Sequence, residues 1–143
     1  MAEPEHMTVH ELVAAAQQRG FAARPKVAGF PYLAEALRAG GVLRHEFLVP
    51  TATSLFTTTA GSAVIPSGAP VVTEPSDVPS WDQPALVAAI EADKQGGEFP
   101  AFVAACWKAG VVRWIIDTAE RTCTYLGADG AQYVENYPAV ELP

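Results

Sequence analysis

Apolar side chains recur along the first part of this chain at the spacing of a helix. The earliest stripe falls at i, i+3, i+4 and i+7 and consists of Val9, Leu12, Val13 and Ala16. This spacing predicts an amphipathic helix. Thr8 and Glu11 fit a capping box at its start. Gly20 is its predicted end, because glycine commonly follows the last helical residue.

A second helix and three short strands are predicted to complete the first half. The second helical stripe consists of Phe30, Leu33, Ala34 and Leu37, and it stops at the pair Gly40-Gly41. Val42 to Val49 then alternates as a strand, and its more apolar face consists of Leu43, His45, Phe47 and Val49. We expect that face to lie against the core. Two further strands are predicted over residues 54–59 and 62–65.

The second half repeats this order after a proline-rich stretch. Residues 66–81 hold four prolines, which predicts a semi-extended linker. Two helices are predicted next, over residues 82–95 and 99–109. Three strands follow at 111–117, 121–127 and 131–135, with a hairpin turn at 128–130. The residues expected to face inward on the first of these strands are Val112, Trp114 and Ile116.

The two halves also match residue by residue. Residues 30–65 align with residues 99–134 without a gap, and the identical pairs include Phe30/Phe99, Pro31/Pro100, Ala36/Ala105, Gly41/Gly110, Val42/Val111, Arg44/Arg113, Thr53/Thr122 and Gly61/Gly130. Chance agreement between two alanine-rich helices would not extend through the glycine stop, the strand arginine and the later turn glycine. We therefore interpret the chain as a single domain, 1–143, with internal repeats at about 8–65 and 82–137.

This organisation predicts an α+β fold. Each repeat is a helix-helix-strand-strand-strand unit, and its sheet would expose an apolar face if it stood alone. Two copies related by pseudo-twofold symmetry can bury that face under their helices in a two-layer domain. The cleft between the copies is then the natural place for a ligand.

Composition argues against several classes of function. The chain has 143 residues, nine basic and sixteen acidic, and a formal net charge of −7. The basic residues are scattered, so we expect no binding to nucleic acid or to a membrane surface. The first residues resemble no secretory signal, and the two cysteines lack a C-x-x-C spacing. We expect a cytoplasmic protein that needs no cofactor.

Part of the second repeat resembles a known family. The pair Phe99-Pro100, the run Ala-Gly-Val-Val-Arg-Trp at 109–114, the run Thr-Tyr-Leu-Gly-Ala-Asp-Gly at 124–130, and Tyr133 are similar to a small bacterial and prophage family of unknown function. Its members are called YbcV-like or "phage envelope protein". The resemblance covers chiefly 99–137, with 30–49 as a weaker echo. It implies an α+β domain without an established activity, and it carries over no catalytic residue.

No catalytic or metal-binding set stands out. Cys106 lies on a helical stripe and Cys123 in a strand, so we interpret both as structural thiols. His6 and His10 lie four residues apart with Glu11 adjacent, a spacing that allows a shared metal. No third ligand accompanies them, and we interpret them as solvated residues. The diglycine pairs lack the context of a phosphate-binding loop.

A small set of polar and aromatic residues remains as candidates for ligand binding: Arg44, Arg113, His45, Trp114, Tyr125 and Tyr133. The arginines occupy equivalent positions, so a pseudo-twofold axis could bring both to one anion. Alternatively, both are solvated on the outer face of the sheet. His45 and Trp114 are equivalent as well, either as part of a pocket or as core residues. Tyr125 and Tyr133 fit a cross-strand aromatic pair.

We favour a binding or interaction module over an enzyme. Its partner would be another protein or a small molecule. The alternative is a ligand-binding protein or enzyme with a site between the repeats, built from these candidates. Homodimer formation through an open sheet edge is a further possibility.

Overall fold

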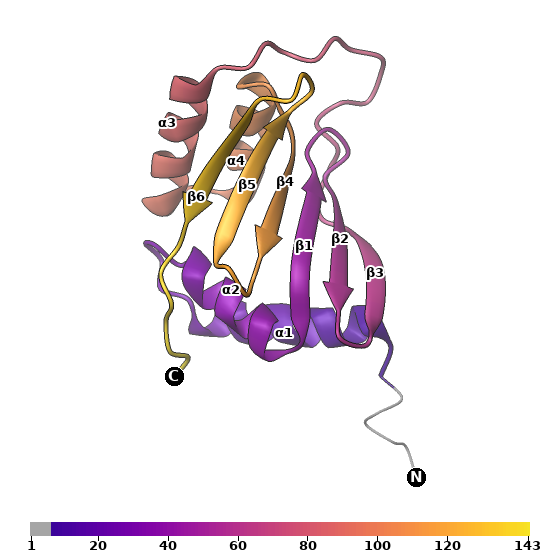
Figure 1. The fold of residues 1–143 in the computed structure, drawn as a ribbon, viewed down its shortest axis with the longest axis vertical. Coiled ribbons are helices and arrows are strands. Elements are labelled where there is room, and N and C mark those ends of the chain that lie inside the picture. The colour runs from indigo at the N-terminus through magenta and orange to yellow at the C-terminus, as the bar shows by residue number, and fades with distance from the viewer. Residues whose placement is uncertain (1–6) are drawn as a thin grey trace.

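The computed structural model describes residues 7–143 and contains four helices and six strands in that part of the chain (Figure 1). The helices are α1 (Val9–Ala23), α2 (Phe30–Ala39), α3 (Gln83–Lys94) and α4 (Phe99–Lys108). The strands are β1 (Val42–Leu48), β2 (Thr53–Thr58), β3 (Gly61–Pro66), β4 (Val111–Asp117), β5 (Thr122–Gly127) and β6 (Gln132–Asn136). The predicted α+β fold, with a helix-helix-strand unit that appears twice, is confirmed.

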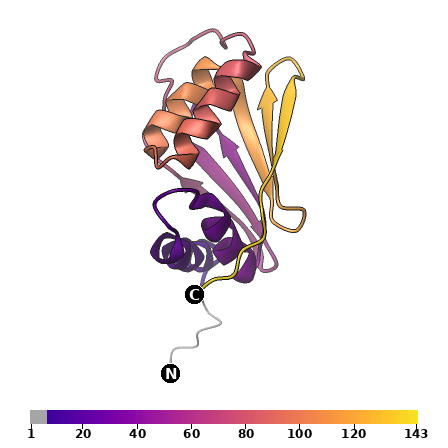
Figure 2. The ribbon, with the colours of Figure 1, turned by 90° about the vertical axis from the view of Figure 1, so that its left-hand side faces the viewer.

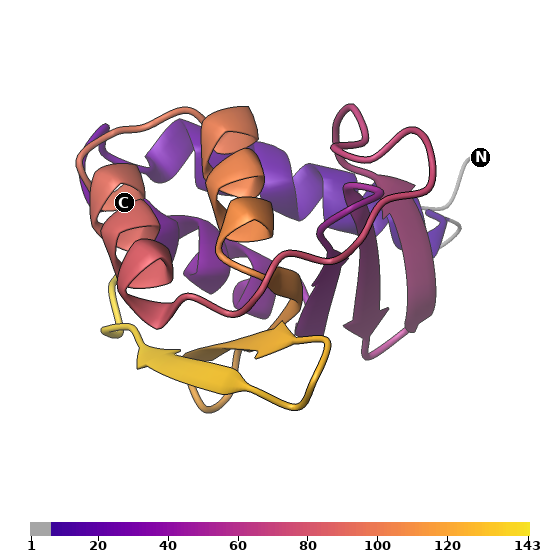
Figure 3. The same ribbon diagram turned by 90° about the horizontal axis from the view of Figure 1, so that it is seen from above.

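The strands form one antiparallel sheet in the order β3-β2-β1-β4-β5-β6. The helices lie on one face of this sheet, and the described part of the chain leaves the other face uncovered (Figure 2). We call these the inner and outer faces. The linker between β3 and α3 crosses from the first repeat to the second (Figure 3).

A pseudo-twofold axis relates the two repeats. β1 and β4 pair at the centre of the sheet, and Glu46 lies opposite Ile115. These two residues are also equivalent in the repeat alignment, so the axis passes through this pair. Both strands have a register shift at the same place, between Val42 and Arg44 and between Val111 and Arg113. Ala52 and its equivalent Arg121 share a positive φ of 54°.

The structure corrects three details of the sequence prediction. α1 does not end at Gly20 but continues to Ala23. Gly20 is needed inside the helix because α2 crosses there: a Cβ at this position would lie 2.9 Å from the Cα of Leu33. Leu43 does not face the core and is 50% exposed. The β-bulge at the start of β1 reverses the alternation there, so that Val42 is buried instead, and the equivalent bulge in β4 buries Val111 rather than the predicted Val112.

The third correction concerns the last strand of each repeat. Leu55 pairs with Val64, whereas its equivalent Thr124 pairs with Val134, so the repeat offset is 69 residues up to β5 and 70 in β6. The extra residue lies in the β5–β6 hairpin, whose turn at 128–130 is confirmed. The alignment without a gap is therefore wrong beyond this turn.

The core consists of two clusters of unequal size. The smaller cluster belongs to the first repeat and consists of Val13, Ala16, Leu37, Val42 and Phe56. The larger cluster is formed mainly by the second repeat and includes Leu86, Val103, Cys106, Trp114, Ile116 and Tyr125. Phe47 of β1 belongs to the larger cluster, so the first repeat contributes to the core of the second.

Candidate functional site

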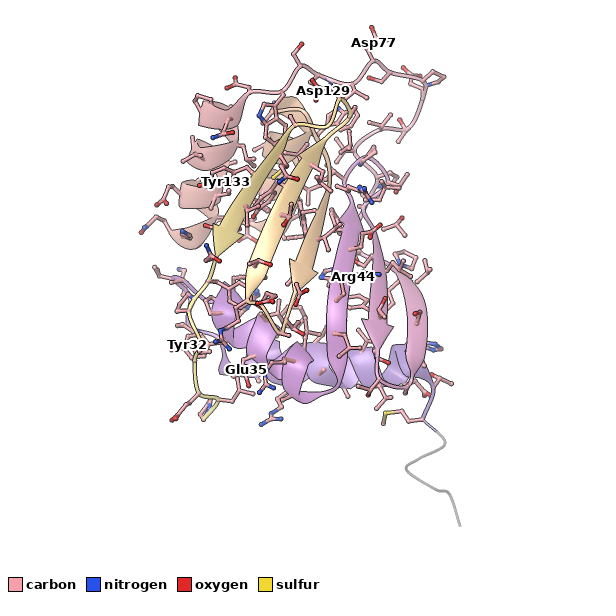
Figure 4. All side chains as sticks on the ribbon, in the orientation of Figure 1. Tyr32, Glu35, Arg44, Asp77, Asp129 and Tyr133 are labelled. Carbon is pink, nitrogen blue, oxygen red and sulfur yellow. The ribbon has the colours of Figure 1, made fainter. Side chains whose placement is uncertain are left out.

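The two predicted arginines lie on the outer face and are not brought together. Arg44 lies opposite Asp117 and Arg113 lies opposite Leu48. Four residues of strand separate these positions, which corresponds to roughly 13 Å. Arg113 Nη1 lies 3.4 Å from Glu46 Oε2, and Arg44 is exposed at the centre of the sheet (Figure 4). The two arginines therefore stand at opposite ends of the β1–β4 pairing.

The outer face combines these central charges with apolar residues toward its sides. Its exposed large apolar residues are Leu48, Leu55, Val64 and Val134, at 43%, 37%, 65% and 45% exposure. The central strands β1 and β4 contribute Arg44, Glu46, Arg113 and Asp117 to the same face. Interface cores are depleted of charged residues, so the centre of this face is not built as a dry docking surface.

The predicted aromatic residues line the inner face in a continuous row. Trp114 stacks on Phe47 with ring centroids 4.4 Å apart, and Tyr125 lies 5.9 Å from Trp114. Tyr133 follows at 6.5 Å from Tyr125. Burial raises the pKa of Tyr125 well above its ordinary value, because the charged phenolate would lose its hydration. Trp114 and Tyr125 are core residues, and Tyr133 packs against the same cluster.

His45 takes part in a buried hydroxyl network. Its Nε2 lies 2.8 Å from Ser54 Oγ, and Ser54 Oγ lies 2.7 Å from Ser67 Oγ. The His45 ring stacks on Phe56 at 4.1 Å, while its Nδ1 is buried and has no hydrogen-bond partner within residues 7–143. Desolvation lowers the pKa of His45 to about 4, so the imidazole is neutral at physiological pH.

This network does not form a nucleophile. A serine nucleophile needs access to substrate and a base that an acidic group orients. Ser54 is only 1% exposed, and no carboxylate of the described part of the chain contacts Nδ1 of His45. The two thiols are buried as well. Burial raises the pKa of Cys123 to about 12 and that of Cys106 further still. Neither cysteine is activated as a thiolate.

The described residues contain no group of three or more His, Cys, Asp or Glu side chains arranged to hold a metal. Of the predicted histidine pair, His6 lies outside the described residues. His10 lies in the first turn of α1 and its side chain is exposed.

A hollow of about 470 Å³ lies where the two repeats meet. The first repeat contributes the end of α2, the start of β1 and Thr59 of the β2–β3 turn. The second repeat contributes the β4–β5 turn and the segment after β6, through Ala139 and Val140. Figure 4 shows Glu35 of α2 at this end of the molecule, close to the C-terminal segment.

Two arginines line the hollow. Arg38 binds Glu35 through two contacts, Nη2 to Oε2 at 2.5 Å and Nε to Oε1 at 2.9 Å. This guanidinium group lowers the pKa of Glu35. Arg121 forms no ion pair within residues 7–143. The hollow therefore holds one paired and one uncommitted guanidinium group.

Local backbone structure fixes Arg121 in this place. Asp117 Oδ1 accepts hydrogen bonds from the backbone N–H groups of Ala119 and Glu120, at 3.1 and 3.0 Å, which closes the β4–β5 turn. The Thr118 hydroxyl donates to the carbonyls of Val42 and Leu43 at 2.7 and 3.1 Å. The turn of the second repeat is thereby fastened to β1 of the first.

Comparison with known proteins gives a family but no activity. Residues 18–136 match the model of a family described as a protein of unknown function, DUF1398. The chain is a member of the DUF1398 family. Uncharacterised proteins of Mycobacterium bovis and Mycobacterium tuberculosis are 44% identical to it over 128 residues, which cover 89% of this chain and 77% of each relative.

Sequence reasoning missed the arginines of the hollow in this DUF1398 protein. Arg38 and Arg121 lie far apart in the chain, and only the pairing of β1 with β4 brings them to one place. One signal was available in the repeat alignment. Arg38 is equivalent to Trp107 and Arg121 is equivalent to Ala52, so each arginine of the hollow corresponds to an apolar residue in the other repeat.

None of the four helices within residues 7–143 combines the length and apolar character needed to cross a lipid bilayer.

Proposed function

We propose that this DUF1398 protein is a non-catalytic binding module whose hollow between the repeats takes a small organic anion. The supporting observation is Arg121, an uncommitted guanidinium group in a hollow of about 470 Å³ to which both repeats contribute. Sites for small molecules commonly measure about 300–1,000 Å³ and combine apolar walls with a few polar groups.

The charges of the hollow favour an anion. Two guanidinium groups and the single carboxylate of Glu35 leave one net positive charge in a chain whose formal net charge is −7. A guanidinium group binds carboxylate or phosphate through two parallel hydrogen bonds. Because Arg38 already forms such a pair with Glu35, Arg121 is the residue left to hold the ligand.

The walls favour an apolar body attached to that anion. Val42, Leu43 and Val140 line the hollow beside the arginines. Leu43 is exposed there only because of the β-bulge. A ligand that joins a carboxylate or phosphate to a small hydrocarbon group would cover these side chains and gain the free energy of burying them.

The same residues support binding rather than catalysis. Glu35 is the only carboxylate among the described lining residues, and Arg38 keeps its pKa low. General acid–base chemistry needs a group whose pKa lies near the working pH. We also propose a cytoplasmic location, no binding to nucleic acid or membranes, and kinship with the YbcV-like group. The envelope label of that group names no ligand.

The test is a titration with phenylacetate, phenyl phosphate and the uncharged phenylacetamide, followed by NMR chemical shifts and calorimetry. We expect the two anions to shift the signals of Gly41, Ala119 and Arg121, and the amide to bind at least tenfold more weakly. Arg121→Gln should weaken anion binding at least tenfold.

The matched control is Arg113→Gln, which removes the same charge from the outer face. Equal losses in both variants, or unchanged binding in Arg121→Gln, would contradict the proposal, because each would mean that the hollow does not hold the anion.

A further inference from the structure

The two edges of the sheet are equivalent in the repeats but differ in chemistry. β6 carries Glu135, whose Oε2 lies 2.9 Å from Nζ of Lys94 on α3. Both edge strands have a helix on their inner side, α3 beside β6 and α1 beside β3 (Figure 2). β3, at the other edge, consists of Gly61, Ser62, Ala63, Val64, Ile65 and Pro66, with no ionisable side chain.

β3 also lacks the backbone devices that protect edge strands. All six of its residues pair in regular register with β2, from Gly61 opposite Thr58 to Pro66 opposite Thr53, without a bulge. Its proline stands at the last position, so the interior of the strand keeps its N–H groups. Natural sheets protect an open edge with charges, bulges or an internal proline. A regular, uncharged edge can accept another extended strand.

We propose that a second copy of this chain occupies that edge, with β3 pairing antiparallel to the partner's β3 to join the two sheets. The inference is independent of the proposed ligand. A strand that pairs with its own copy about a twofold axis meets the same residues in reverse order. For β3 this pairing brings no like charges together.

Charge favours this edge over the rest of the surface as the contact between copies. The chain has sixteen acidic and nine basic residues, so two copies repel each other over most orientations. The approach along β3 sets uncharged backbone against uncharged backbone. Salt should therefore strengthen the dimer by screening the remaining repulsion.

The side chains of β3 also suit self-pairing about Val64. Val64 lies on the outer face and is 65% exposed, the highest value among the exposed large apolar residues of the described chain. Centred on this residue, the pairing sets Val64 beside its copy on the outer face and Ala63 beside Ile65 on the inner face. Ile65 packs against the smaller core cluster, so that cluster would continue into the partner. Cross-strand apolar pairs of this kind stabilise sheets.

One strand pair buries less surface than a standard interface, so we expect a weak dimer that dissociates on dilution. Sedimentation velocity of the full chain over a hundredfold range of concentration should show a monomer that converts to a dimer, and more completely at higher salt.

Val64→Lys places two ammonium groups side by side and should weaken the dimer at least tenfold. Val134→Lys at the equivalent position on β6 is the control and should leave the dimer unchanged.

A cysteine variant tests the register directly. Val64→Cys should form a disulfide-linked dimer under mild oxidation, since the two native thiols are buried, whereas Val134→Cys should remain monomeric. A wild-type chain that stays monomeric at every concentration would overturn the proposal. So would a dimer unaffected by Val64→Lys, or equal cross-linking of the two cysteine variants, because each would assign the contact to another surface. Circular dichroism of each variant checks that it is folded.

Discussion

The two repeats of this protein share a backbone and differ in what their side chains do. Both have the bulge at the start of the central strand, a positive-φ glycine before it (Gly41 and Gly110), and a positive φ in the following turn. The second repeat holds most of the larger core cluster. The first repeat holds the smaller cluster and the unprotected edge, and the charged hollow lies between the two repeats.

This comparison separates the residues that the fold requires, at the turns, from side chains that can differ between the repeats. Glycine or a strained residue recurs wherever the chain must turn, because few side chains tolerate a positive φ. The side chains at the equivalent positions 38 and 107 are not constrained in this way. Trp107 packs against the core in the second repeat, where the first repeat has the half-exposed Arg38. The second repeat holds more of the buried core, whereas the proposed contacts with other molecules involve the hollow between the repeats and the β3 edge of the first.

The largest effect is expected where the repeats share one core. Phe47 of β1 is fully buried and stacks on Trp114 of β4. Phe47→Ala should lower the free energy of unfolding by about 4 kcal/mol, through the lost burial and the cavity left behind. Urea unfolding followed by tryptophan fluorescence, which reports only on residues 81–114, should coincide with unfolding followed by circular dichroism. Separate transitions would mean that the repeats unfold independently.

Acid should destabilise the protein through His45 of the first repeat, whose equivalent is the non-titrating Trp114. Burial lowers the pKa of His45 from 6.5 to about 4. Between these values the unfolded chain binds a proton that the folded chain does not, so stability falls as the pH falls. The loss reaches at most about 3 kcal/mol at pH 4.

The contribution of His45 can be isolated by comparing the stability profiles of the wild type and His45→Phe between pH 7 and pH 4. The variant should lose the part of the slope that belongs to this residue. Parallel profiles would refute the assignment, whatever the absolute stability of the variant.

The two turn glycines should differ in their tolerance of alanine. Gly41 and Gly110 both have a positive φ, which costs an L-residue about 1–2 kcal/mol. A Cβ on Gly110 would also lie 2.8 Å from the backbone of Ser80 and Trp81, whereas a Cβ on Gly41 would meet only the Thr59 hydroxyl, at 3.0 Å. Gly110→Ala should therefore lower the melting temperature more than Gly41→Ala. Equal shifts would show that the linker moves aside freely.

The smallest effect on stability is expected from making the Arg38 position resemble its equivalent in the second repeat. Arg38→Trp exchanges an exposed ion pair, which contributes little to stability, for an apolar ring of the kind found at Trp107. The free energy of unfolding should change little, while phenylacetate binding should be lost because the ring fills the hollow. Retained binding with unchanged affinity would argue against the proposed site.

The sequence predicted the elements because their apolar spacing is regular, and it predicted the repeat because turn glycines and Arg44/Arg113 recur. It missed the exposure of Leu43, since a bulge changes the pleat without changing the residue types around it. It missed the continuation of α1 through Gly20, since the need for that glycine comes from Leu33 on another helix. Both errors concern contacts between elements, which periodicity does not encode.

Some candidate residues could likewise be placed from periodicity, whereas others depend on contacts between elements. Trp114 and Tyr125 could be placed inward from strand alternation alone. The network of His45, Ser54 and Ser67 and the hollow of Arg38 and Arg121 depend on which strands are neighbours. That order became known only from the sheet, in which β1 pairs with β4.

The residue pair on the pseudo-twofold axis bears on the origin of the molecule. If each half once existed as a separate chain that assembled symmetrically, its axis residue faced its own copy. Two copies of the second half would set Ile115 against Ile115, an apolar contact, while two copies of the first half would set Glu46 against Glu46, with like charges together. Fusion removes this conflict, because Glu46 now lies opposite Ile115 and binds Arg113. Because of the Glu46 carboxylate at the axis, the second half is a better partner for the first half than another copy of the first half would be.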